Sequence, residues 1–133
     1  MQVYFILFVV ALFGAGNCGN NDAKKIACIH GKFNNDIGSA GYTNCHQRSG
    51  ALPIPRIKQC YQEVMKTAQV VVTVGGKQKV DGTKFAEYAA AHSTSDVGKA
   101  MGACSRKTDA QEIYKKASST TQCVFSEVKR TCK

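Results

Sequence analysis

The sequence has few prolines, no tryptophan and half as many acidic as basic side chains. Its 133 residues include 2 Pro and 12 Gly, too few for a collagen-like or low-complexity chain. An apolar fraction of 44% with 20% charged residues excludes a disordered chain. No apolar run reaches the roughly 18 residues that a membrane-spanning helix needs. The composition therefore predicts a small globular domain with a modest hydrophobic core.

Motifs for catalysis and nucleotide binding are also missing. The patterns G-x-S-x-G, H-E-x-x-H, G-x-G-x-x-G and the P-loop do not occur in the sequence. No second histidine lies at a helical spacing from His30, His46 or His92, and neither His30 nor His46 has a carboxylate at such a spacing to build an acid–base or metal pair. No Cys-x-x-Cys occurs, although zinc sites use closely spaced thiolate pairs. We therefore expect neither an enzyme nor a bound metal or cofactor.

The N-terminal region carries the pattern of an export signal. Val3–Phe13 is an uninterrupted apolar run followed by small residues, as in a secretory signal peptide. Cleavage after Cys18 would leave an even number of cysteines, whereas cleavage after Gly16 also fits the small-residue rule but leaves one thiol unpaired. We expect residues 1–18 to be a signal peptide, residues 19–133 to form one domain, and the mature protein to be secreted.

The remaining cysteines are separated by long, uneven intervals. Three disulfides are the expected arrangement, each worth about 2–4 kcal/mol, and they fit an oxidising compartment. The spacing alone leaves their pairing open. The six expected disulfide cysteines are Cys28, Cys45, Cys60, Cys104, Cys123 and Cys132.

Apolar periodicity predicts an all-α protein of five or six short helices. The clearest stripe runs from Ile57 to Ala68 at positions i, i+3, i+4, i+7, i+8 and i+11. Further helices are expected over residues 23–33, after Thr83, over 97–104, over 110–117 and from Val124. Pro53 and Pro55 are expected to start the first of the strong helices, Thr83 and Thr94 or Ser95 to cap two others, and Thr108–Gln111 to form a capping box.

The valine run at 70–74 is ambiguous. Its β-branched residues favour a strand, and Gly75-Gly76 would end it. Because no partner strand is evident nearby, we predict an apolar helix end or a buried loop there.

The net charge of +9 is spread along the chain in short groups. Scattered lysines are typical of solvated helix faces, and attraction to anionic membranes or acidic partners is the functional alternative. Export and the absence of aromatic residues among the basic ones argue against nucleic-acid binding. We expect a monomer.

The apolar stripes either pack on one another or surround a cavity that binds an apolar ligand. Disulfide cross-links would allow an incompletely filled centre, and such cavities take apolar ligands. We predict a compact helical bundle, cross-linked by three disulfides, that encloses an apolar cavity. The candidate ligand-binding residues on its inward stripes are Met65, Ala68, Val72, Phe85, Tyr88, Met101, Ile113, Tyr114 and Phe125.

The stretch from Cys60 onward resembles the odorant-binding protein family. The segment Cys60–Met65, the valine run and Lys79–Tyr88, with its V-D-G-x-x-F pattern, are similar to that family's third helix, apolar loop and next helix start. Cys104, Cys123 and Cys132 look like the family's last three cysteines. The resemblance covers residues 57–133 and implies a helical carrier of odorants, semiochemicals or fatty-acid-like molecules.

The sequence departs from that family in its cysteines. Val64 stands where the second cysteine of the third helix belongs, and Cys45 is additional. These features look like the divergent proteins of mites and ticks. If Cys60 matches the family's second cysteine, the resemblance implies the pairs Cys60–Cys123, Cys104–Cys132 and Cys28–Cys45. If it matches the third, Cys28–Cys60 and Cys45–Cys123 are implied instead.

The competing hypothesis is a cationic secreted defence or salivary protein. It would act on membranes through its charge, or sequester metal if His30 and His46 converge. A carrier fold that has lost its ligand is a third interpretation.

Overall fold

The computed structural model describes residues 23–35, 42–45 and 53–132. The expected signal peptide, Cys18 and His46 lie outside these residues. The described part contains a helix at 23–35, a helical turn at 42–45, α3 (Ile54–Thr67), β1 (Val71–Val74), β2 (Lys77–Val80), α4 (Gly82–Ala91), α5 (Asp96–Ser105), α6 (Ala110–Tyr114) and α7 (Ala117–Arg130). The expected helical fold with three disulfides is thus confirmed, with one short two-stranded sheet added.

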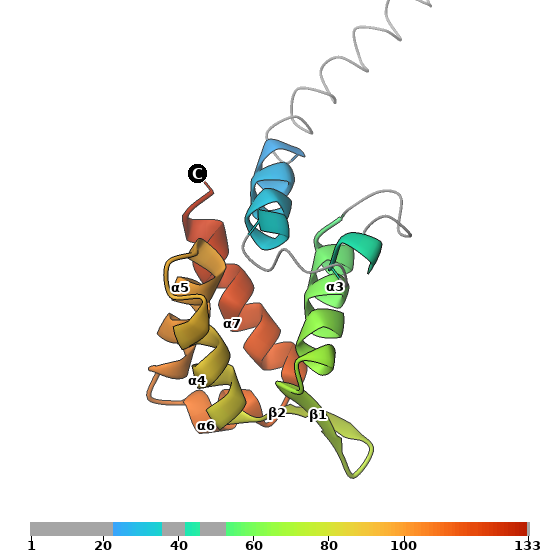
Figure 1. Cartoon of the computed structure of the whole chain (residues 1–133), viewed down its shortest axis with the longest axis vertical. Helices are drawn as coiled ribbons and strands as arrows, with labels where there is room; N and C mark the ends of the chain where they lie inside the picture. The colour runs from blue at the N-terminus through green and yellow to red at the C-terminus, as the bar shows by residue number, and fades with distance from the viewer. Residues whose placement is uncertain (1–22, 36–41, 46–52, 133) are drawn as a thin grey trace, which may run out of the picture.

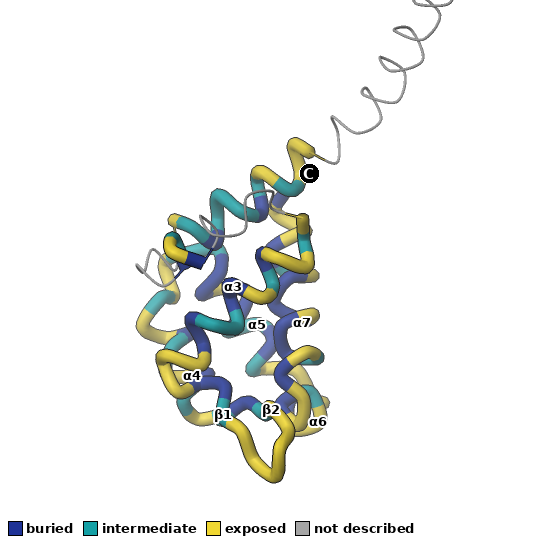
Figure 2. Tube along the Cα trace, turned by 90° about the vertical axis from the view of Figure 1, so that its right-hand side faces the viewer, coloured by how far each residue is buried: buried dark blue, intermediate teal, exposed yellow. Residues whose placement is uncertain are grey.

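Helix α7 lies at the centre of the fold, between α3 on one side and the α4–α5 pair on the other (Figure 1). It contacts α3, α5, α6 and β2, and its inner face is buried (Figure 2). The helix at 23–35 is tied to α5 by an ion pair of 2.6 Å between Lys32 and Asp96. The Lys32 hydrogen bond holds the pKa of the Asp96 carboxyl below its usual range.

Aromatic side chains pack together in the core of the described part. The rings of Phe33 and Phe125 stack with their centroids 4.5 Å apart, and Tyr61 packs edge-on against Phe33 at 5.4 Å. All three residues are buried. Here the apolar stripes of the helix at 23–35, α3 and α7 therefore pack on one another.

Helix α3 begins as the prolines predict, since Pro53 is its N-cap and Pro55 lies in its first turn. It ends at Thr67 in a Schellman motif: the Gln69 N–H donates to the Lys66 carbonyl and the Val70 N–H to that of Met65. Gln69 takes the left-handed conformation, with φ of 62°. Helix α3 therefore ends just before Ala68, the last residue of the expected apolar stripe.

The prediction of a helix end or buried loop at the valine run is wrong. β1 pairs with β2 in an antiparallel hairpin whose register joins Val71 to Val80 and Val74 to Lys77. Gly75 and Gly76 have φ of 59° and 77°, as a two-residue type I′ turn requires. The partner strand was overlooked because Lys77–Val80 is mostly polar, and the glycine pair connects the strands instead of ending the structure.

Two of the expected caps are replaced. Asp81, two residues before the expected Thr83, caps α4 by accepting from the Thr83 and Lys84 N–H groups at 3.1 Å. Ser95 caps α5 as one of the two expected candidates. No capping box forms at Thr108–Gln111, since the N-cap of α6 is Asp109 and its side chain makes no capping bond.

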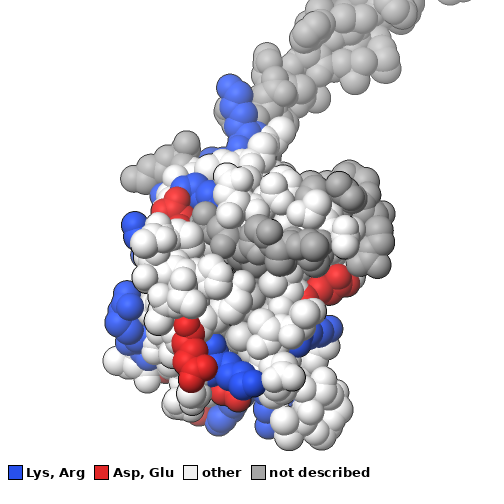
Figure 3. All heavy atoms as spheres, in the orientation of Figure 1, with Lys and Arg blue, Asp and Glu red and all other residues white. Residues whose placement is uncertain are grey.

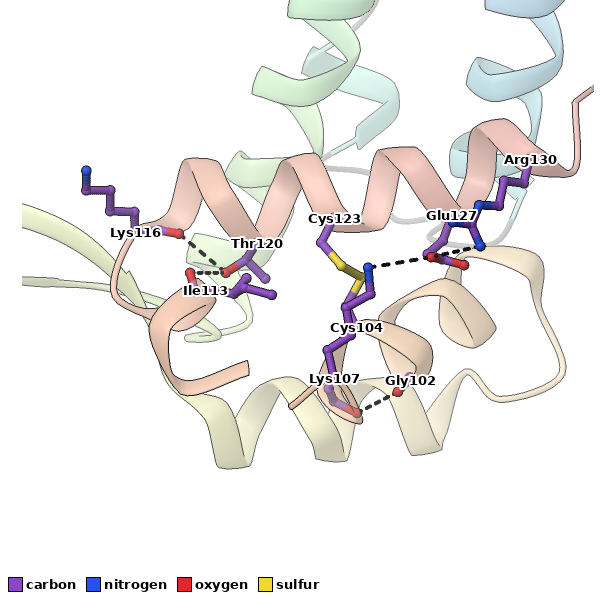
Figure 4. Close-up of a disulfide and its surroundings, with 10 residues drawn as sticks. Gly102, Cys104, Lys107, Ile113, Lys116, Thr120, Cys123, Glu127 and Arg130 are labelled. Carbon is purple, nitrogen blue, oxygen red and sulfur yellow. Dashed lines mark hydrogen bonds and ion pairs between the residues drawn. A yellow bond between two sulfur atoms is a disulfide. The ribbon is translucent and has the colours of Figure 1, made fainter. Parts of the chain in front are cut away.

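The expected helix over 110–117 is divided. α6 ends at Tyr114 and α7 begins at Ala117, three residues later. The Thr120 hydroxyl donates to the Ile113 carbonyl at 3.0 Å and also lies 3.3 Å from that of Lys116 (Figure 4). It thereby satisfies a carbonyl at the end of α6 and stabilises the bend between the two helices.

All six expected cysteines are bonded, but the implied pairings are wrong. The bonds are Cys28–Cys132, Cys45–Cys60 and Cys104–Cys123. Cys104 of α5 faces the middle of α7, where Cys123 lies (Figure 4). Cys132 lies about 13 Å farther along the helix axis at 1.5 Å per residue, so it is too far away for Cys104 to bond it. Cys132 instead bonds Cys28 of the helix at 23–35. The second bond, from Cys45, joins the turn at 42–45 to α3.

Candidate functional site

The expected ligand-binding residues lie in different environments. Met65, Phe85 and Met101 are fully buried. Tyr114 is buried against Phe85, with ring centroids 5.4 Å apart, and Tyr88 and Ile113 are half-buried. Ala68 is exposed because α3 ends before it, and Val72 lies opposite Lys79 on the hairpin. Of the nine, Phe125 alone lines the groove described next.

That groove lies between the helix at 23–35, the start of α3 and the second half of α7. Its volume is about 370 Å³, within the range of small-molecule sites. The apolar residues that line it are Ile26, Ile29, Ile54 and Phe125. The polar ones are Lys25, Lys58, Gln122, Ser126 and Lys129. We call these nine residues the amphipathic groove.

Helical spacing explains how each element contributes to the groove. Gln122, Phe125, Ser126 and Lys129 of α7 fall at i, i+3, i+4 and i+7, so they share one face. Ile54 of α3 lies one turn before Lys58, and Ile26 one turn or so before Ile29 on the neighbouring helix. Three rigid helices therefore bring apolar and basic side chains to one place.

Lys58 is the most precisely placed of the groove lysines. Its ammonium donates to the Gln122 side-chain oxygen at 2.6 Å and lies 5.6 Å from the centroid of the Phe125 ring. The neighbouring lysines, Lys25 and Lys129, are exposed. No Asp or Glu is among the described residues that line the groove. The arrangement combines an apolar floor with positive charge at its border, which suits a molecule with an apolar body and an anionic head.

The basic side chains elsewhere do not form one block. In the face shown by Figure 3 they are scattered, and several have an acidic neighbour. Glu127, for example, lies 3.8 Å from the Lys107 ammonium and 3.5 Å from the Arg130 guanidinium (Figure 4). The groove differs from this general pattern because its lysines border apolar side chains and not carboxylates.

The two described histidines are engaged in local contacts. The Nδ1 atom of His30 lies 2.9 Å from the Tyr42 hydroxyl, and the two rings stack. His92 donates from Nδ1 to the Tyr88 carbonyl at 2.9 Å and stacks on the Tyr88 ring. Among the described residues, no three or more His, Cys, Asp or Glu side chains converge as a metal site would require.

Most groove residues were not predicted as ligand contacts. Ile26 and Ile29 lie in a segment expected only to be helical, and the lysines were expected on solvated helix faces. The sequence pattern that could have indicated the groove is one face of α7 that carries both apolar and polar residues. On that face Phe125 is followed by Ser126 and Lys129 at helical spacing. A stripe that changes from apolar to basic within one face marks the border of the core, and grooves form at such borders.

Comparisons with known proteins give no relative: no family model, curated protein or solved structure matches this chain. Within the described part, none of the helices has the length and apolar character needed to cross a membrane.

Proposed function

We propose that this protein is a secreted carrier of small amphipathic molecules that have an apolar body and an anionic head. The observation that carries the proposal is the amphipathic groove, in which isoleucines and Phe125 form the floor and lysines the border. The predicted signal peptide and the three disulfides support secretion. The resemblance of residues 57–133 to odorant-binding proteins supports a small apolar ligand, and no covalent step is involved.

The groove differs from the enclosed cavity expected from the sequence. A ligand lying in it would be covered on one side and exposed on the other. Burial of about six methylenes at ~0.8 kcal/mol each contributes roughly 5 kcal/mol. A charge-assisted hydrogen bond from Lys58 adds about 2 kcal/mol. The sum corresponds to a Kd of roughly ten micromolar before ordering costs, so the carrier would load and release its ligand readily.

The test compares decanoic acid with decanol as competitors for a fluorescent fatty-acid probe on the oxidised protein. The two compounds have the same chain and differ in head charge. We expect the acid to compete about tenfold better, because the hydrogen bond that a carboxylate accepts from Lys58 is about twice as strong as the one that a hydroxyl accepts. Lys58→Met keeps the length of the side chain and removes its charge, so it should abolish that preference and weaken decanol binding much less than acid binding.

Lys99→Met is the matched control, since Lys99 is an exposed residue of α5 that does not line the groove. It should retain the preference for the acid. Equal affinity of the unaltered protein for acid and alcohol, or an equal loss in both variants, would contradict the assignment of the groove. Absence of any displaceable binding would contradict the carrier function itself.

A further inference from the structure

The β1–β2 hairpin is buried at its base and exposed toward its turn. Residues directly opposite each other in an antiparallel pair project to the same side, and alternate residues share a face. Val71 and Val80 are paired and buried at the base, whereas Thr73 and Gln78 on the same side are exposed. The register then places Val72, Val74, Lys77 and Lys79 together on the other side. We call these four residues the outer hairpin face.

The outer hairpin face projects from the body of the protein. The turn between the strands extends beyond the helices and is exposed (Figures 1 and 2). Val74 is 53% exposed at this turn, and it is the one large apolar side chain among the described residues with that degree of exposure. Its cross-strand partner is Lys77, which is also exposed. An apolar tip is therefore flanked directly by positive charge.

Further lysines lie near the second strand of the hairpin. Lys115 and Lys116, between α6 and α7, border the same cleft as Lys77 and Lys79, together with Gln62, Gln78, Ala117 and Ser118. None of the described residues that line this cleft is acidic. Lys115 pairs with Glu112 at 2.8 Å, whereas Lys77, Lys79 and Lys116 have no ion pair with a described carboxylate. Two separate segments thus contribute positive charge to one end of the molecule.

We propose that the outer hairpin face, with Lys115 and Lys116, docks this protein on anionic lipid bilayers. The lysines would contact the headgroups, each adding about 1 kcal/mol, or roughly fivefold, to binding. Val74 and Val72 would enter the boundary between headgroups and acyl chains. A polyanion without an apolar phase, such as a sulfated polysaccharide, would use the lysines but gain nothing from the valines. The combination of both side-chain types therefore favours the bilayer.

The docking face and the amphipathic groove lie toward opposite ends of the molecule. The hairpin follows the end of α3, whereas the groove is built from the start of α3 and the second half of α7 (Figure 1). A docked protein would keep its groove directed away from the bilayer. The docking proposal does not depend on the proposed carrier function, and each can fail without the other.

Co-sedimentation with vesicles tests the proposal on the oxidised full-length protein. We expect binding to vesicles of phosphatidylcholine mixed with phosphatidylserine, falling with added salt, and little binding to phosphatidylcholine alone. The double variant Lys77→Gln with Lys79→Gln should bind about 25-fold more weakly, from roughly fivefold per lysine. Lys24→Gln with Lys99→Gln removes the same charge from exposed positions outside the cleft and should cause a much smaller loss.

A tryptophan reporter tests insertion independently. Since the sequence contains no Trp, Val74→Trp introduces a single indole at the hairpin tip, and Ala90→Trp places one on an exposed position of α4 as the control. The emission of the first should shift to the blue on anionic vesicles and that of the second should not. Equal binding to neutral and anionic vesicles, equal losses in the two lysine pairs, or heparin binding without vesicle binding would overturn the proposal.

Discussion

Gly98 is the residue with the least room for a side chain among the described glycines. It lies in the first turn of α5, where that helix meets the end of α4. A Cβ atom at this position would lie 1.7 Å from the His92 carbonyl oxygen. That oxygen is held by the Ser95 N–H at 3.0 Å and by its hydroxyl at 2.8 Å. The close contact between α4 and α5 therefore requires a residue without a side chain at position 98.

We predict that Gly98→Ala lowers the free energy of unfolding by about 3 kcal/mol, because the backbone of the α4–α5 turn must move. Chemical denaturation of the oxidised protein measures the change. Gly31→Ala is the control, since a Cβ there meets no atom within 4 Å. In a helix interior that change should stabilise by up to about 1 kcal/mol. Similar effects at the two positions would contradict the close approach described for Gly98.

At the scale of elements, the hairpin depends on the conformation of its turn. Gly76 has φ of 77°, a value that L-residues adopt at a cost. We predict that Gly76→Ala lowers stability by about 1–2 kcal/mol. Gly75→Asn should be tolerated, because Asn-Gly is the preferred pair for a type I′ turn. Thermal unfolding of both variants tests this, and equal losses from the two changes would argue against a type I′ turn.

The elements that sequence periodicity predicted well are those with a continuous buried face. α3 and α5 follow their apolar stripes, and the start of α3 follows from Pro53 and Pro55. The helix boundaries that were wrong depend on hydrogen bonds from particular residues. Gln69 ends α3 although glutamine is a good helix former, and Thr120 bonds back to Ile113 at the bend. Such bonds compete with the helix locally and leave no periodic pattern.

At the scale of the whole molecule, the pairing of cysteines was the least predictable feature. Six cysteines allow 15 pairings, and the choice depends on which helix ends meet. Cys28 reaches Cys132 because the helix at 23–35 lies beside the end of α7. The groove was missed for the same reason, since it forms only when three helices are placed together. Periodicity identifies the faces of helices but does not specify their neighbours.

The described tyrosines are all buried enough to resist ionisation. Burial raises the pKa values of Tyr42, Tyr61, Tyr88 and Tyr114, and for Tyr61 the neighbouring Tyr88 adds to the effect. Unfolding would release them to ionise near their ordinary pKa of about 10. The unfolded chain would then lose these protons first, so stability is full below that pH and falls as the pH rises above it.

We predict that the free energy of unfolding decreases above about pH 10. Phenolate absorbance should show the tyrosines titrating later in the native protein than in denaturant. Tyr61→Phe should reduce the steepness of the decline, because it removes the tyrosine that is both fully buried and without a hydrogen-bond partner among the described residues. Native and denatured titration curves that coincide would be inconsistent with the buried hydroxyls.

The Cys28–Cys132 bond also has a mechanical consequence, because 104 positions separate its two cysteines. Tension applied to chain segments outside this pair would pass from sulfur to sulfur and bypass the helices between them. The domain would act as a short, inextensible link under load, and only a reducing agent would allow it to stretch out.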